Sequence, residues 1–339
     1  MSHFINIVVK LRILKKTLLT ARNTLLNNLI GVRCAALGTF ILLALASLVF
    51  IIPMPLIASD NAGAFLEKGL HPRPAGMGFS HTGLAQDSNA VYWNPAGLSE
   101  LEGLDLSLMM TEAFDTQYSA FQIAKNWNGL GLGLTCIQAQ MGGIQETVPW
   151  IDDRYIFSGN AYTYQAAAIL MSLGKKVFNN LSLGVTGKIV YEVAADYSAS
   201  GMGMDLGVKY EPFPNVTIGT NFQNIISPQM EWNTPSKNVD SIPFNLKTGA
   251  AYKPFDYLMC IADLDFRNKR KAKLHIGMEY VLSEALPIRA GLDDGKLTLG
   301  LGIYLGEFRC DFSWISPEID EAADIYRFAI SYFLINNKH

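Results

Sequence analysis

"KAKLHIGMEY", residues 271–280, alternates strictly between polar and apolar side chains. One parity holds the charged or ionisable residues Lys271, Lys273, His275 and Glu279. The other parity is wholly apolar and consists of Ala272, Leu274, Ile276, Met278 and Tyr280. Successive side chains of a β-strand point to opposite faces, so this segment predicts a strand with one charged and one apolar face.

The same alternation recurs in "LSLGVTGKIVYE" (181–192), "GMGMDLGVKY" (201–210) and "KLTLGLGIYL" (296–305). A soluble sandwich with one wet face could produce it. A sandwich seldom has so many long strands, however, whereas a tilted strand that crosses a bilayer needs about 9 to 11 residues. We find fourteen such segments, an even number, as a closed bacterial barrel requires. They lie near 104–112, 117–125, 129–139, 161–173, 181–193, 201–210, 215–223, 242–252, 256–265, 271–281, 286–292, 296–305, 307–315 and 325–334. The predicted fold is all-β: a 14-stranded antiparallel transmembrane barrel of the outer-membrane type, spanning residues 104–335.

The connections between these strands are of two kinds. Most are short turns, but 140–160 and 225–241 are long, and barrels of this type keep short turns in the periplasm and long loops outside. The two long connections carry the large apolar side chains Trp150, Tyr155, Phe157, Met230 and Trp232. Such side chains predict contact with a ligand or a cargo protein; the alternative is that the loops fold inward as a lid.

Composition and charge narrow the classes of function. Half of the residues are hydrophobic, 17% are charged, and the net charge is −3. The body of the chain has no basic block interleaved with aromatic residues, so we expect no nucleic-acid partner. Cys136, Cys260 and Cys310 lie in separate apolar strand patterns, which does not suggest a disulfide framework. No Ser/His/Asp or Cys/His grouping has catalytic or metal-ligand spacing, so we expect neither an enzyme nor a metal or other cofactor.

The N-terminal segment predicts export. Residues 1–58 contain no acidic residue, and basic side chains precede the apolar run 34–52. Pro53 and Pro55 end this run, and the small residue Ala58 follows. This order is typical of a signal peptide, which we place at 1–58; an uncleaved transmembrane anchor is the alternative.

Residues 59–103, between the predicted signal and the first strand, resemble neither. The segment is rich in glycine and asparagine, and adjacent aromatic residues precede an Asn-Pro dipeptide that favours a turn. We predict a compact plug, or hatch, inside the barrel; the alternative is a periplasmic linker, in which two large aromatic side chains would be left in water. The candidate gating residues are Gly76, Gly78, Tyr92, Trp93, Asn94, Pro95, Ala96 and Gly97.

Charged residues also occur on the parity that would face the lumen. They are Lys188, Asp205, Lys209, Lys247, Glu279, Arg289, Arg309 and Asp311. Charges of both signs would pair into a network that fills the bore, and a broad apolar conduit is difficult to trace through it.

A family resemblance supports these predictions. "RPAGMGFSHTGLAQDSNAVYWNPAGLSEL" (73–101) resembles the N-terminal signature of the PorV/PorQ family and, more distantly, that of the FadL/TodX-type outer-membrane transporters of hydrophobic compounds. Weaker similarity continues through "GMDLGVKYEPFPNVTIGTNFQN", "LHIGMEY", "LPIRAGLDDGKLTLGLGI" and "YRFAISYF". The resemblance implies a fourteen-stranded barrel closed by an N-terminal hatch whose turn is Asn94-Pro95-Ala96. The chain departs from the family pattern at Phe79, where a second glycine is usual.

The resemblance implies a bacterial outer-membrane protein with lipid as its immediate partner. Two roles follow: passage of a hydrophobic small molecule through the barrel, or handling of cargo proteins together with other components of type IX secretion. A purely structural outer-membrane protein is a further alternative.

Overall fold

The computed structural model describes residues 62–149, 154–268, 270–317 and 324–334. The predicted signal peptide at 1–58 and the candidate contact residue Trp150 lie outside these ranges. Within them, no helix has both the length and the apolar character needed to cross a membrane.

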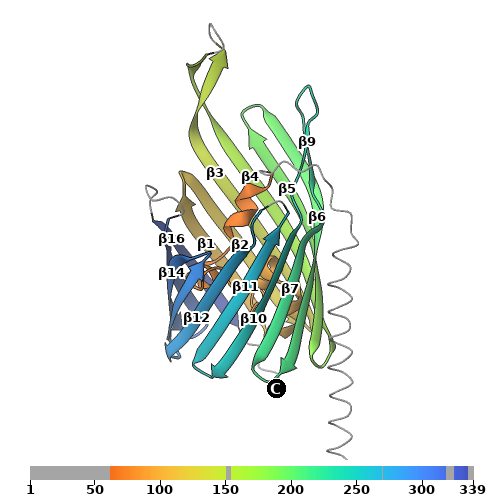
Figure 1. Ribbon diagram of the computed structural model, residues 1–339, viewed down its shortest axis with the longest axis vertical. Helices are drawn as coiled ribbons and strands as arrows, with labels where there is room; N and C mark the ends of the chain where they lie inside the picture. Colours follow the sequence, from red (N-terminus) through yellow and green to blue (C-terminus); the bar gives the residue numbers. More distant parts are fainter. Residues whose placement is uncertain (1–61, 150–153, 269, 318–323, 335–339) are drawn as a thin grey trace, which may run out of the picture. The chain divides into compact units, whose positions relative to one another are not determined.

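Sixteen antiparallel strands form one sheet, and fourteen of them close into a barrel (Figure 1). The ring closes through β1 with β16 and through β5 with β6, while the hairpin β8–β9 is attached to β6 outside the ring. The ring strands are β1 Leu104–Ala113, β2 Thr116–Trp127, β3 Leu130–Pro149, β4 Tyr155–Phe178, β5 Leu181–Ala194, β6 Tyr197–Phe213, β7 Val216–Ile226, β10 Asn245–Phe255, β11 Leu258–Arg267, β12 Lys273–Ser283, β13 Leu286–Asp293, β14 Lys296–Leu305, β15 Phe308–Ile315 and β16 Ile325–Leu334. Every predicted strand is present, which confirms the fourteen-stranded antiparallel barrel.

The prediction that 140–160 is a loop was wrong. β3 and β4 continue through this segment as a two-stranded arm that stays paired as far as Pro149↔Tyr155. Both faces of the arm are largely exposed, so its sequence lacks the alternation that marks the other strands. Its β-branched and aromatic residues nevertheless favour pairing. Tyr155 and Phe157 lie on the arm and are 70% and 67% exposed.

The second long connection, 225–241, is also structured. It contains β8 (Gln229–Trp232) and β9 (Val239–Ser241). Met230 is buried, and the indole Nε1 of Trp232 donates to Asp240 at 3.0 Å, with its ring packed against the buried core. These side chains therefore follow the inward-folding alternative rather than projecting as exposed contacts.

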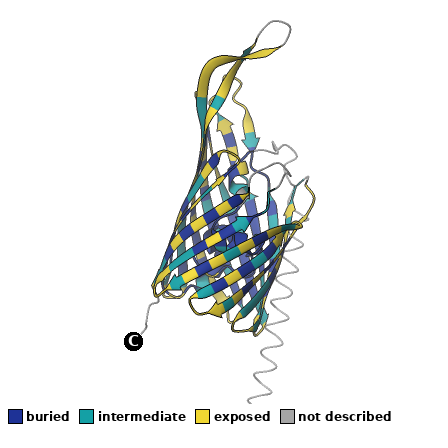
Figure 2. Cartoon of the chain, turned by 90° about the vertical axis from the view of Figure 1, so that its left-hand side faces the viewer, coloured by how far each residue is buried: buried dark blue, intermediate teal, exposed yellow. Residues whose placement is uncertain are grey.

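The two faces of the barrel wall differ as the sequence predicted. On β12, His275 and Glu279 are buried, whereas Leu274, Ile276 and Met278 are exposed on the outer face. Figure 2 shows the resulting alternation of buried and exposed residues along the strands. An outer surface of this kind is suited to lipid.

We expect Met278→Arg to destabilise the folded barrel by about 2 to 4 kcal/mol, because it places a charge on the outer face near the middle of β12. Leu282→Arg, on the same strand near the turn that follows it, is the control and should cost about 0 to 1 kcal/mol. The measurement is the urea dependence of heat-modifiable gel mobility. Equal stability of Met278→Arg and wild type would show that this face does not contact lipid.

The barrel has two distinct mouths. We call the end that bears the short turns 128–129, 179–180, 214–215, 256–257, 284–285 and 306–307 the lower mouth, and the end that bears the arm and the β8–β9 hairpin the upper mouth. Leu104 of β1 pairs with Leu334 of β16 at the lower mouth, so the chain enters its first strand there. The general rule for such barrels assigns the lower mouth to the periplasm.

Candidate functional site

Residues 62–103, which we call the plug, lie inside the barrel (Figure 1). They form four short helices: η1 Ala64–Lys68, α2 Pro72–Gly76, α3 Ala90–Trp93 and η2 Pro95–Glu100. Hydrogen bonds join the plug to opposite sides of the wall, with Gly78 N donating to Thr298 on β14 and the side chain of Asn94 donating to Val208 on β6. Most of its described residues are buried.

The Asn94-Pro95 turn is fixed by the side chain of Asn94. Its Nδ2 donates to the carbonyl of Thr82 at 3.0 Å and to that of Val208 at 2.9 Å. Its Oδ1 accepts from Ala96 N at 3.2 Å and so caps η2, which begins at Pro95. Because Asn94 is fully buried, each of these bonds satisfies a group that water cannot reach.

Plug and wall meet backbone to backbone where the wall carries glycine. A Cβ on Gly184 of β5 would lie 2.3 Å from both Ala96 N and Pro95 C. A Cβ on Gly277 of β12 would lie 2.4 Å from Met77 O. No larger residue fits at either position unless the plug shifts.

Trp93 lies at the centre of the plug. Its ring stacks on Phe79 at 6.4 Å between centroids and meets the edge of Tyr92 at 5.2 Å. Its Nε1 donates to the carbonyl of Leu70 at 3.4 Å, and the Lys247 ammonium lies 5.2 Å above the ring. Apart from the contact with Lys247, these contacts of Trp93 are to other plug residues.

Arg289 of β13 is the centre of a buried ion network, which we call the latch. Its side chain is fully buried and donates to Glu279 and to Asp311, each at 2.6 Å. Glu279 also accepts from Arg73 of the plug at 2.9 and 3.0 Å, and Arg73 donates to Asp87 at 3.1 Å. The latch therefore joins the plug to β12, β13 and β15.

The latch controls the charge of its plug residues. Burial alone would lower the pKa of the Arg73 guanidinium, but the charge of Glu279 and the bonds to it outweigh burial and raise this pKa well above its usual value. Burial would likewise raise the pKa of Asp87, but His81 and Arg73 hold it well below its usual range. Both side chains therefore remain charged.

The remaining lumenal charges are placed individually. Three lysines pair with carboxylates: Lys188 with Asp205 at 2.7 Å, Lys209 with Glu100 at 2.5 Å, and Lys247 with Asp265 at 2.6 Å. Arg309 is half-buried, and its guanidinium lies 4.1 Å above the ring of Phe333. Sequence reasoning missed the plug partners Arg73, Asp87 and Glu100, because an irregular segment has no periodicity that marks which side chains face inward.

His71 begins helix α2 and is buried. Its Nδ1 accepts from Arg73 N at 3.2 Å, and its Nε2 lies 3.4 Å from Ser331 Oγ on the wall. Burial is the main influence on the imidazole and lowers its pKa from 6.5 to about 4, so the ring is neutral at pH 7.

We expect acid to weaken the seating of the plug. An imidazole exposed by plug displacement regains its pKa of 6.5, against about 4 when seated, so the seated form binds fewer protons between these values. The stability of the seated plug relative to the displaced plug is therefore constant above about pH 6.5. It falls by up to about 3 kcal/mol as the pH drops from about 6.5 through about 4. Planar-bilayer conductance should rise over this window.

The control for the acid effect is His71→Asn. An asparagine side-chain oxygen can accept from Arg73 N as the imidazole does. This variant should conduct no more at pH 4.5 than at pH 7. An unchanged acid response in His71→Asn would assign the effect to the carboxylates instead.

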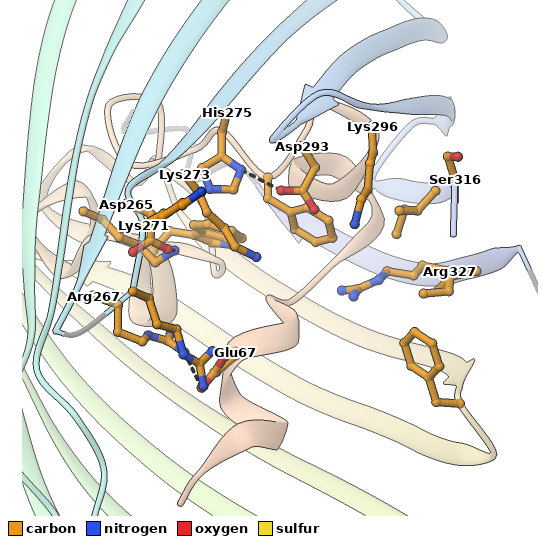
Figure 3. Close-up of a pocket in the computed structure, with 17 residues that line it drawn as sticks. Glu67, Asp265, Arg267, Lys271, Lys273, His275, Asp293, Lys296, Ser316 and Arg327 are labelled. Atoms are coloured by element: carbon orange, nitrogen blue, oxygen red, sulfur yellow. Dashed lines mark hydrogen bonds and ion pairs between the residues drawn. The ribbon is translucent and has the colours of Figure 1, made fainter. Parts of the chain in front are cut away.

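Two cavities flank the plug. The upper pocket (Figure 3), at the upper mouth, has about 930 Å³ of empty space, part of it open to solvent. Its lining includes Phe79 and Trp93. The lower pocket, at the lower mouth, has about 1010 Å³, and its lining includes Arg73 and Glu279.

On β12 a single plug loop, Met77–Ser80, separates the two pockets. His275 lines the upper pocket and Glu279 the lower, and Gly277 between them contacts Met77. The loop is held by Gly78, whose N donates to Thr298 Oγ1 and whose O accepts from His275 Nδ1, each at 2.8 Å.

Several solved structures share this fold. The toluene transporter TodX of P. putida matches with a TM-score of 0.58 and 11% identity over 79% of this chain and 99% of that one. A mutant of the TodX monoaromatic hydrocarbon channel gives a TM-score of 0.57 and 12% identity over 79% and 99%. A FadL homologue of Pseudomonas aeruginosa matches with a TM-score of 0.52 and 11% identity over 83% of this chain and 99% of that one.

These similarities show that the chain has the barrel fold of the FadL/TodX outer-membrane channels. No protein-family model matches the chain, and no curated protein sequence matches it. The PorV/PorQ resemblance therefore remains a prediction.

Proposed function

We propose that this protein is an outer-membrane channel that takes a small molecule with an apolar body into the upper pocket and releases it to the lower pocket when loop Met77–Ser80 moves. The observation that carries this proposal is the pair of pockets on either side of one plug loop.

One part of the upper pocket lining is apolar and suits the apolar body of a ligand, while most of the lining is charged. Phe79 and Trp93 form an aromatic floor, and Phe114 and Ile315 add apolar surface at its edge. Concave sites with apolar walls and a few polar groups are the usual form of small-molecule sites. The fold shared with a toluene transporter and a monoaromatic hydrocarbon channel supports the same class of ligand.

Movement of the loop requires few bonds to break. Gly78 donates to Thr298 and accepts from His275, and removal of both bonds frees the loop from β12 and β14. The latch holds the neighbouring helix α2 through Arg73, so the loop can move while the rest of the plug stays bonded to the wall.

A cargo-handling role in secretion is the second candidate, and the β3–β4 arm favours it. Among the described residues, β3 has no partner on its β2 side after Met141, and β4 has none on its β5 side before Tyr164. Open strand edges of this kind can pair with an extended segment of another protein. The exposed aromatic side chains of Tyr155 and Phe157 would add contact area.

The channel is tested by uptake of the uncharged apolar dye N-phenylnaphthylamine into intact cells whose lipopolysaccharide excludes it. Thr298→Val keeps the side-chain shape but removes the bond from Gly78 N to the wall and leaves this N–H only its longer bond to Ala75 O at 3.2 Å, so at a cost of about 0.5 to 1.5 kcal/mol uptake should rise about 2- to 10-fold. Thr111→Val is the control, because that hydroxyl donates to Tyr326 on the exposed side of the wall. Dye uptake by wild-type cells equal to that of cells lacking the protein would exclude the channel.

A further inference from the structure

The charge of the upper pocket is strongly unbalanced. Seven cationic side chains line it against three carboxylates. The cations are Lys247, Arg267, Arg270, Lys271, Lys273, Lys296 and Arg327, and the carboxylates are Glu67, Asp265 and Asp293. Figure 3 shows Lys273 on one side of this space and Lys296 and Arg327 on the other.

The three carboxylates already have partners. Glu67 pairs with Arg267 and with Arg270, the latter at 3.0 Å. Asp265 accepts from Lys247 at 2.6 Å, and Asp293 Oδ1 lies 3.0 Å from His275 Nδ1.

Lys271, Lys273 and Lys296 have no carboxylate partner among the residues that the structure describes. Like charges gathered around one pocket repel one another, and a bound anion would remove that repulsion. A phosphate monoester carries about two negative charges at pH 7, so it offsets more of this excess than a carboxylate does.

A buried polar atom at the pocket is also unsatisfied. His275 is 5% exposed, and both contacts of its Nδ1, Gly78 O and Asp293 Oδ1, are acceptors, so Nδ1 carries the proton. The other ring nitrogen, Nε2, is buried without a hydrogen-bond partner among the described residues. A hydroxyl or a protonated phosphate oxygen of a ligand could donate to it.

Phe79 is held in a conformation that a bulky residue rarely adopts. Its φ is 62°, in the left-handed region, which is strained for a residue with a Cβ. Its ring lies against Trp93 and 5.0 Å below the Arg327 guanidinium. Strain retained at one position points to a function for the side chain, and here that side chain forms part of the pocket floor.

We propose that the upper pocket binds an organic phosphate with an aromatic or otherwise apolar body: Lys271, Lys273 and Lys296 bind the phosphate, and Phe79 and Trp93 contact the body. This inference rests on the proposed channel function and names its substrate class.

The first test is calorimetric titration of the full chain in detergent with phenyl phosphate, benzoate and benzyl alcohol. Charge-assisted hydrogen bonds favour the dianion, so phenyl phosphate should bind at least about tenfold more tightly than benzoate, and benzyl alcohol most weakly. The preference should decrease with added salt. Equal affinity for phenyl phosphate and benzyl alcohol would overturn the proposal.

Matched lysine variants locate the site. The triple variant Lys271→Gln, Lys273→Gln, Lys296→Gln should weaken phenyl phosphate binding about 100-fold, as expected for the loss of several charge-assisted bonds. The control removes the same charge at three exposed lysines outside the pocket, through Lys125→Gln, Lys175→Gln and Lys176→Gln. An equal loss in the control would reduce the effect to net charge and overturn the assignment.

Phe79→Gly tests whether the aromatic ring contributes to the binding of phenyl phosphate. Glycine relieves the left-handed backbone, which offsets part of the packing lost with the ring, while phenyl phosphate should bind more weakly and inorganic phosphate equally well. Unchanged phenyl phosphate affinity would remove the aromatic floor from the site.

Two further experiments identify the negative charge that balances the three lysines. The sequence has Glu318, Asp320 and Glu321 outside the described residues; if phenyl phosphate binds only after these acids are changed to amides, they and not a ligand balance the lysines, and the proposal fails. If phosphatidic acid in phosphatidylcholine micelles competes with phenyl phosphate, the bound phosphate is that of a lipid. If it does not compete, the ligand is a soluble compound. Either result is consistent with the site.

Failure of this inference differs from failure of the channel. Binding of phenyl phosphate by a protein that gives no uptake of N-phenylnaphthylamine would exclude the channel and leave the site. Uptake of the dye by a protein that does not prefer phenyl phosphate would exclude the site alone.

Discussion

Gly184→Val should turn a nearly silent barrel into one that conducts in planar bilayers. A Cβ at this position lies 2.3 Å from the backbone of Ala96 and Pro95, so either η2 or the strand must move. Valine favours a strand, and β5 is hydrogen-bonded on both sides, so we expect the plug to move. Overpacking of this kind should destabilise the seated plug by about 1 to 3 kcal/mol, so the fraction of channels that are open should rise about 10- to 100-fold.

Gly187→Val is the matched control on the same strand. A Cβ there meets no atom within 4 Å, so this variant should be as silent as wild type. Deletion of 62–103 should define the fully open conductance. If Gly184→Val folds and inserts yet never opens, the contact between η2 and β5 does not seat the plug.

Arg289→Met should have the largest effect on stability, at about 3 to 5 kcal/mol. The substitution leaves Glu279 and Asp311 buried without the guanidinium that lies 2.6 Å from each of them. Urea titration followed by heat-modifiable mobility measures this loss. Lys176→Met should cost less than about 1 kcal/mol, because Lys176 pairs with Glu211 at 3.7 Å in an exposed position.

A rescue experiment separates unpaired charge from lost packing. Combining Arg289→Met with Glu279→Gln and Asp311→Asn removes both carboxylates, so much of the lost stability should return. No recovery in the triple variant would mean that the Arg289 side chain stabilises the wall mainly by its volume.

The barrel could be predicted because lipid outside and polar groups inside impose a period of two on every spanning strand. Met278 and Glu279 are neighbours in sequence and lie on opposite faces for that reason. Outside the spanning region this constraint is absent: the β3–β4 arm has two exposed faces, and its sequence resembled a loop.

The location of the plug could be predicted from the sequence, but its internal structure and its contacts with the wall could not. Tyr92, Trp93 and the Asn94-Pro95 turn indicated a compact segment, yet nothing local shows that Arg73 pairs with Glu279, 206 residues away. The position of Phe79 was noted only as a departure from a glycine pattern, and its left-handed backbone became apparent only in the structure.

The length of the β3–β4 arm determines how far it extends past the barrel wall. At about 3.3 Å per residue, the eight residues of 142–149 extend the hairpin by roughly 26 Å past the last rung that β3 shares with β2. That length is close to the thickness of a bilayer's hydrocarbon core. An extension of that length is an expected target for antibodies and proteases, which would bind or cut it without disturbing the wall or the plug.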